Sequence, residues 1–144
     1  MKTAYYLALA CATACASAPA EPASSCAVQP HLKSLESTYF ADSCAFSGCH
    51  TTADADSAGH LDLSAGKARA QLLGIAAVQK TAAKSGKIRV VAGHPEQSYL
   101  IDKVTTAPNT ALDRLMPYGA TKPYDADCSI AALKTWIANG ALDD

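Results

Sequence analysis

This 144-residue chain has few aromatic residues, and it has almost no excess of charge of either sign. Phe, Trp and Tyr make up only 6% of the residues, and much of the 49% that are hydrophobic is alanine, so side chains alone bury little apolar area. The 12 Lys and Arg nearly balance the 13 Asp and Glu. The net charge of −1 therefore excludes a general basic field for nucleic acid.

The common catalytic and metal-binding motifs are also missing. The chain has no nucleophile elbow, phosphate-binding loop or zinc-protease motif. Its cysteines and histidines lack the C-x2-C or H-x3-H pairs of structural zinc sites, and Asp54, Asp56 and Asp62 lack the spacing of a calcium loop. We therefore expect a protein that is not an enzyme.

No apolar run reaches the roughly 20 residues that span a bilayer, but the N-terminus has the features of an export signal. Lys2 gives it a positive charge, and Tyr5 to Ala14 form a short apolar region. The segment Ala18 to Ala20 has small residues where a signal peptidase reads them. These features predict a signal peptide that is cleaved before Glu21.

Lipidation is the alternative route, since Cys11 and Cys15 each follow small residues as lipoprotein cysteines do. In both cases we expect residues 1–20 to be a signal peptide or lipoprotein signal, residues 21–27 a flexible tether, and residues 28–144 one domain. The domain is expected in the periplasm or cell envelope. A lipidated cysteine would attach it to a membrane.

Apolar side chains recur at helical spacing, which predicts an all-α domain with long loops. The expected helices are Val28–Asp42, Ser64–Leu73, a segment that begins at Pro95 and continues through Val104, and a last helix that Asp125 caps and Gly140 ends. The apolar faces of the first and last helix are formed by Val28, Leu32, Leu35 and Tyr39, and by Ile130, Leu133, Trp136 and Ile137.

Two segments between these helices have weaker signals. Residues 87–92 are briefly β-like, and residues 107–122 are irregular. The basic residues Lys80, Lys84, Lys87 and Arg89 predict a solvated loop, with a docking patch for an acidic redox partner as the alternative.

The first helix ends at a cysteine motif that is typical of covalent haem attachment. Cys44 and Cys49 are separated by four residues, and His50 follows directly. Thioether bonds from two cysteines fix a porphyrin, and the adjacent histidine then becomes the proximal iron ligand. The common motif has two intervening residues; here the small residues Ser47 and Gly48 permit the longer loop. The alternative is that both cysteines form disulfides.

Met116 is the only methionine besides Met1, and it lies in an irregular segment rather than on a helix face. Pro117 follows it and favours an extended backbone that can present the sulfur to iron. His and Met together raise the reduction potential of haem iron. We therefore expect Met116 as the distal ligand, with a core-filling role as the alternative.

Several segments follow one another in the order found in one family. They are the helix before Cys44, Cys49–His50, Gly59–Leu63, Gly93–Leu100, Met116–Pro117 and Trp136–Ala141. The series resembles a small exported bacterial class I c-type cytochrome domain with one haem, over nearly the whole of the mature chain. Two positions depart from the family pattern: Cys44 and Cys49 have four residues between them, and His94 stands where these domains have an acidic helix cap.

The resemblance implies a cytochrome c-like fold, in which the N-terminal and C-terminal helices pack across each other and long loops wrap the haem. It implies an electron-transfer protein with one haem c (iron) per chain and with redox partner proteins of the cell envelope. The cofactor-binding residues are then Cys44, Cys49, His50 and Met116, of which His50 and Met116 bind the metal. One or two thioether bonds both stay open.

Cys26 and Cys128 remain once the haem has taken its pair. The resemblance implies a disulfide between them, because the family fold brings the two terminal helices together. A Cys44–Cys128 disulfide is the alternative, and it would leave Cys49 as a single thioether.

Other functions and ligands stay open. The chain could be a haem-free, disulfide-stapled binding or structural module outside the cytoplasm, or a haem sensor or peroxidase-like enzyme from which Met116 dissociates. His60 or His94 could replace Met116 as distal ligand. Arg89 and Arg114 are either partners of haem propionates or ordinary surface charges.

Overall fold

The computed structural model describes residues 26–107, 113–125 and 128–144. The predicted signal 1–20 and most of the tether 21–27 lie outside these ranges. In these ranges the regular structure is helical, and no β-strand forms apart from isolated bridges such as the one between Leu73 and Val90. The prediction of an all-α domain with long loops is therefore confirmed.

The first helical segment runs without a break from Leu32 to Ser43. It consists of α1 (Leu32–Ser34), a π-helix η1 (Leu35–Phe40) and α2 (Ala41–Ser43). It begins four residues later than predicted. His31, which has an extended backbone, is the N-cap, and its Nδ1 accepts a hydrogen bond from the Ser34 N–H at 3.2 Å.

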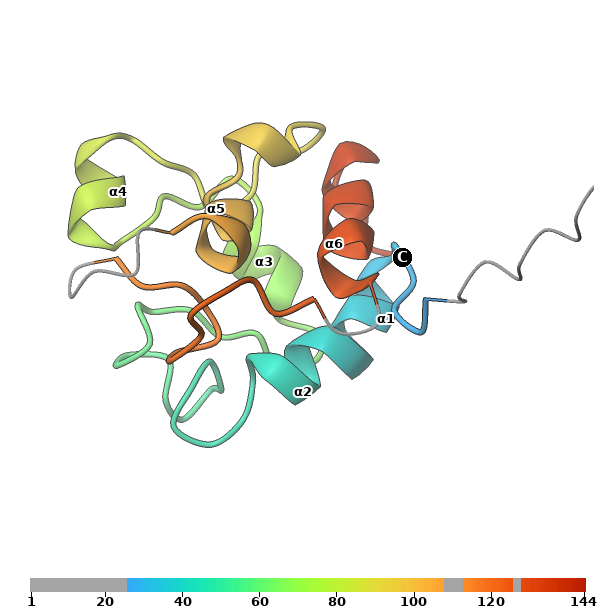
Figure 1. Ribbon diagram of the computed structural model, residues 1–144, viewed down its shortest axis with the longest axis horizontal. Coiled ribbons are helices and arrows are strands. Elements are labelled where there is room, and N and C mark those ends of the chain that lie inside the picture. Colours follow the sequence, from blue (N-terminus) through green and yellow to red (C-terminus); the bar gives the residue numbers. More distant parts are fainter. Residues whose placement is uncertain (1–25, 108–112, 126–127) are drawn as a thin grey trace, which may run out of the picture.

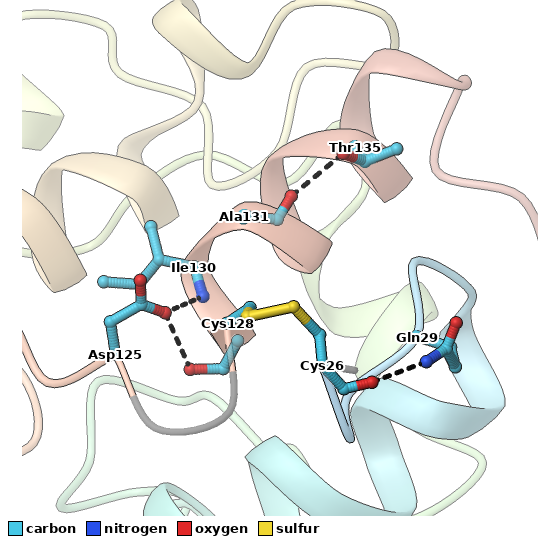
Figure 2. The surroundings of a disulfide bond; sticks show 8 residues. Cys26, Gln29, Asp125, Cys128, Ile130, Ala131 and Thr135 are labelled. Atoms are coloured by element: carbon cyan, nitrogen blue, oxygen red, sulfur yellow. Dashed lines mark hydrogen bonds between the residues drawn. A yellow bond between two sulfur atoms is a disulfide. The ribbon is translucent and has the colours of Figure 1, made fainter. Parts of the chain in front are cut away.

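The last helix is α6 (Ser129–Ala138), and its N-cap is Cys128, with a left-handed φ of 61°, rather than the predicted Asp125. Asp125, three residues earlier, still bonds to the first turn of the helix. One oxygen of the Asp125 carboxylate accepts hydrogen bonds from the Ile130 N–H at 2.7 Å and from the Ser129 hydroxyl at 3.3 Å (Figure 2). The bond from Ile130 satisfies one of the backbone donors that a helix leaves free in its first turn. Gly140, with a φ of 97°, lies just past the end of the helix, where a left-handed residue is usual.

The two terminal helices form the core together. Figure 1 shows α6 beside α1, and η1 contacts α6. Asp144 joins the segment after α6 to the start of α1, because it accepts hydrogen bonds from Leu32 N–H at 2.8 Å and Lys33 N–H at 3.1 Å. The predicted apolar faces are buried in one cluster, which includes Val28, Leu32, Leu35, Tyr39, Ile130, Leu133, Trp136 and Ile137.

We expect Leu133→Ala to lower the free energy of unfolding by about 2–5 kcal/mol, as is usual for a fully buried leucine. Chemical denaturation gives this value directly. Leu142→Ala is the matched control, because its side chain is 53% exposed and should cost little. A loss below about 0.5 kcal/mol for Leu133→Ala would contradict its place in the seam between the helices.

A disulfide joins Cys26 to Cys128 (Figure 2). It links the segment that precedes α1 to Cys128, the N-cap of α6, across a sequence separation of 102 residues. The implied pairing is confirmed, and the alternative Cys44–Cys128 disulfide is wrong. A cross-link that closes so long a loop restricts the unfolded chain and is worth about 2–4 kcal/mol in typical proteins.

The middle of the chain differs from prediction in two places. The helix expected from Ser64 is shorter, because α3 spans only Ala68–Leu72 and Lys67 is its N-cap. The first part of the basic stretch is not a loop, since α4 covers Lys80–Lys84, whereas Lys87 and Arg89 lie outside the helix. The Gln79 side chain caps α4 by accepting a hydrogen bond from the Ala82 N–H at 2.9 Å. The charged composition of the stretch did not indicate this cap.

A short 3₁₀ helix and α5 follow α4 along the chain. The 3₁₀ helix η2 (Pro95–Gln97) begins at Pro95 as predicted, but the expected helix is not continuous, because Ser98 has an extended backbone and separates η2 from α5 (Tyr99–Thr105). Figure 1 places α4 at the opposite side of the molecule from α6, with α5 between them. None of the helices in the described ranges is long and apolar enough to cross a bilayer.

Candidate functional site

Four residues chosen from the sequence meet in one cavity of about 590 Å³. Cys44, Cys49, His50 and Met116 all line it, although His50 and Met116 are 66 positions apart in the sequence. Much of the remaining wall is apolar and comes from several elements; it includes Leu61, Leu63, Leu72, Val78, Leu100 and Val104. The volume lies within the range of about 300–1,000 Å³ that is usual for cofactor and ligand sites.

The cysteine loop is a compact turn at the end of α2. The Cys44 N–H still donates to the Phe40 carbonyl at 2.9 Å, so Cys44 continues the helical hydrogen bonding. The loop then closes on itself, since the His50 N–H donates to the Cys44 carbonyl at 3.0 Å and the Cys49 N–H to Phe46 at 2.9 Å. Four intervening residues therefore fit without separating Cys44 from His50.

Asp54 holds this loop from outside. Its Oδ2 accepts hydrogen bonds from the Gly48 N–H at 3.0 Å and from the Thr51 hydroxyl at 2.6 Å, and these bonds hold the pKa of the Asp54 carboxyl below its usual value. Gly48 has a φ of 83°, a left-handed backbone that other residues adopt at a cost. The glycine in the longer cysteine loop is thus used for its backbone freedom, as the sequence indicated.

His50 is oriented by its own ring nitrogen. Its Nδ1 lies 3.2 Å from the Leu61 carbonyl oxygen, a bond in which the ring must donate, and this leaves Nε2 as the nitrogen with a free lone pair. Burial lowers the pKa of His50, and the charges of Arg89 and Lys103 lower it further, against the opposing effect of the Leu61 bond. The imidazole is therefore held neutral, as a metal ligand requires.

Cys44 and Cys49 are free thiols. Burial raises the pKa of the Cys44 thiol to about 12, with a smaller contribution from the neighbouring Cys49. Cys44 is thus protonated and a weak nucleophile at neutral pH. Both partly buried thiols and His50 face the same cavity.

Arg89 brings a positive charge to the wall of the cavity. Its side chain is buried, and its Nη atoms donate to the carbonyls of Gln71 at 2.8 Å, Gly59 at 2.8 Å and His60 at 3.1 Å. In the part of the chain that the structure describes, it forms no ion pair with a carboxylate. The sequence interpretation of the basic stretch as solvated is wrong for Arg89, because burial depends on the tertiary fold.

The other histidines turn away from the cavity. His31 caps α1, while His60 and His94 are exposed and bond through Nδ1 to Asp56 and Glu96, each at 3.1 Å. Of the histidines in the described ranges, His50 alone lines the cavity. The structure therefore does not bring His60 or His94 to the place where Met116 lies.

Sequence reasoning missed a polar cluster beside Met116. Tyr99 and Lys103 of α5 line the cavity, and both bond to Asp113. The i, i+4 spacing of Tyr99 and Lys103 is the only signal that the sequence offers, and it does not identify Asp113 as the partner. Arg114, weighed as a propionate partner, lies over the ring of Tyr118 at 4.8 Å.

Asp62 anchors the loop that follows His50. Its buried carboxylate accepts hydrogen bonds from the Thr52 hydroxyl at 2.7 Å and the Ser64 N–H at 3.0 Å, and it pairs with Lys67 at 3.1 Å. The Thr52 bond above all, with Ser64 and Lys67, holds the pKa of Asp62 below its usual range. The charged carboxylate therefore stabilises the folded protein.

We expect Asp62→Asn to weaken the dependence of the free energy of unfolding on pH in acid solution. A carboxyl whose pKa is lowered by folding contributes stability above its unfolded pKa of about 4, and the contribution is lost as the pH falls below that value. Denaturation at several pH values between neutrality and pH 3 measures the effect. Asp56→Asn is the control, because Asp56 is fully exposed; equal pH profiles for the two variants would contradict this role of Asp62.

No protein-family model matches the chain, and no curated protein or solved structure matches it either. The function is therefore argued from the geometry of the cavity.

Proposed function

We propose that the protein is an electron carrier that holds one covalently attached haem c in the cavity, with His50 and Met116 as axial ligands. The observation that carries the proposal is the meeting of Cys44, Cys49, His50 and Met116 in one largely apolar space. Two thiols, an imidazole and a thioether are the donor set that c-type cytochromes use.

The residues present fit the group. The aliphatic wall suits the porphyrin face, and the free Nε2 of His50 suits iron, since Nδ1 is already occupied by Leu61. Arg89 supplies a buried cation without a carboxylate partner among the described residues, which suits a propionate. When bound, haem supplies an iron centre that gains and loses one electron.

The chain's own residues then define how the centre works. Cys44 and Cys49 fix the cofactor, and His50 stays neutral because it is buried next to two cations. Met116, which lines the same cavity as His50, would hold the metal through its sulfur and would keep small ligands from it. A thioether is a soft ligand that favours the reduced state and raises the potential.

The fold supports the same proposal. The contact between η1 and α6 places the N-terminal and C-terminal helices together, as expected for a cytochrome c-like domain. The Cys26–Cys128 disulfide suits an oxidising compartment, which agrees with export to the periplasm or cell envelope. Redox proteins of the envelope are the proposed partners, and a lipidated cysteine the proposed membrane attachment.

A haem-free module of the same fold is the second candidate. The disulfide favours it, because this bond joins the two terminal helices without any cofactor. A haem sensor or peroxidase-like enzyme is a third, and it requires Met116 to leave the iron.

The deciding experiment is a haem stain after denaturing electrophoresis of protein made in the periplasm with a cytochrome maturation system. Covalent haem gives a stained band, whereas a well-folded but unstained wild-type protein would overturn the proposal in favour of the haem-free module. Resistance of the reduced, native protein to carbon monoxide then separates the electron carrier from the sensor.

A further inference from the structure

The loop that carries Met116 is tied to one face of α5. The Met116 N–H donates to the Lys103 carbonyl at 2.7 Å. Asp113 Oδ1 accepts hydrogen bonds from the Tyr99 hydroxyl and from Lys103 Nζ, both at 2.9 Å, and Lys103 Nζ also donates to the Arg114 carbonyl. Tyr99 and Lys103 are four residues apart, so they lie on the same side of the helix.

These side chains are largely withdrawn from water. The side chains of Lys103 and Asp113 are 15% and 13% exposed, and Tyr99 is buried. Burial, together with Asp113, raises the pKa of Tyr99 above its usual range, so its hydroxyl stays protonated and donates. Removing one partner of such a pair leaves the other charge without compensation, which is costly.

We propose that Asp113 is a positioning residue that keeps Met116 in the cavity by holding its loop on α5. The proposal rests on the proposed function, in which the Met116 sulfur binds iron. Asp113 lies only three residues before Met116, so its bonds to Tyr99 and Lys103 restrict where the sulfur can move. Asp113 does not itself line the cavity.

The bonds from Asp113 to Tyr99 and Lys103 decide which chemistry the site supports. With the loop held on α5, the thioether stays on the metal and the protein only carries electrons. With the loop released, the sulfur exchanges with small ligands. Asp113 thereby regulates access to the iron from outside the cavity.

The test compares wild type, Asp113→Ala and Asp113→Glu in the haem-loaded protein. We expect Asp113→Ala to bind carbon monoxide at least about tenfold more readily in the reduced state, and to speed hydrogen exchange at the Met116 amide by a similar factor. Asp113→Glu, which keeps the charge, should recover part of both. Asp102→Asn is the matched control. Asp102 also lies on α5, but its carboxylate pairs with Lys87, at 2.8 Å, and not with the loop of Met116.

Tyr99→Phe serves as a milder variant if Asp113→Ala fails to fold, since it removes one donor and keeps the ion pair. Wild-type carbon monoxide binding and wild-type exchange at Met116 in the Asp113 or Tyr99 variants would overturn the positioning role. Failure of the proposed function looks different: the wild-type protein would then carry no covalent haem. In that case the exchange rates still decide whether Asp113 holds the loop.

Discussion

Replacing Cys44 and Cys49 together by Ala is expected to yield a colourless protein that is largely unfolded. Both thiols line the cavity from which the cofactor would be lost. Without it, a largely apolar cavity of about 590 Å³ is left unfilled in a domain that has few large side chains of its own. The side chains that line such a cavity lose van der Waals contacts, and this loss lowers the free energy of unfolding.

The measurement combines the haem stain with far-ultraviolet circular dichroism. The matched control is the double variant Cys26→Ser, Cys128→Ser, which also removes two cysteines but none of the cavity wall. This control should keep its covalent haem and lose only the stability of the disulfide, about 2–4 kcal/mol. A double Cys44, Cys49 variant that stays folded and coloured would contradict the role of both thiols.

Single replacements separate one thioether bond from two. If both cysteines attach the haem, Cys44→Ala and Cys49→Ala should each retain a stained band of reduced intensity. Loss of all stain in one variant and none in the other would show that a single cysteine carries the attachment. Since Cys44 lies at the end of a helix and Cys49 in the following turn, either outcome fits the length of the loop.

Local signals explain which parts of the fold could be predicted. The apolar faces of the first and last helix and Gly140 are encoded within a few residues, and they are found as expected. Asp125 bonds to the first turn of α6, although Cys128 is the N-cap. The wide π-turns of η1 have no such signal. Their hydrogen bonding, in which the Ala41 N–H at the end of η1 reaches back five residues to the Glu36 carbonyl, is visible only in three dimensions.

The site divides in the same way. Cys44, Cys49, His50 and Met116 were found by residue type and spacing, since few residues can bind haem iron. The buried environment was not: Arg89 looks like a surface cation in sequence, yet three carbonyls from distant segments surround it. Asp113 was overlooked because nothing local relates it to α5.

Replacing Met116 by Ala should open the iron to external ligands and lower its reduction potential while leaving the haem attached. The cysteines are untouched by this change, so the haem stain should equal that of wild type. Loss of the thioether removes a soft ligand that favours the ferrous state. The reduced variant should therefore bind carbon monoxide stoichiometrically under conditions in which wild type binds almost none.

Met116→His is the companion variant, because an imidazole can restore the sixth ligand. It should again resist carbon monoxide, but at a potential below that of wild type, since a harder nitrogen donor favours ferric iron. Absorbance spectra and redox titrations of the three proteins give the comparison. A shared potential and shared ligation in wild type and Met116→Ala would make Met116 a core-filling residue. The distal ligand would then have to come from elsewhere in the cavity wall, because His60 and His94 lie at the surface and bond to Asp56 and Glu96.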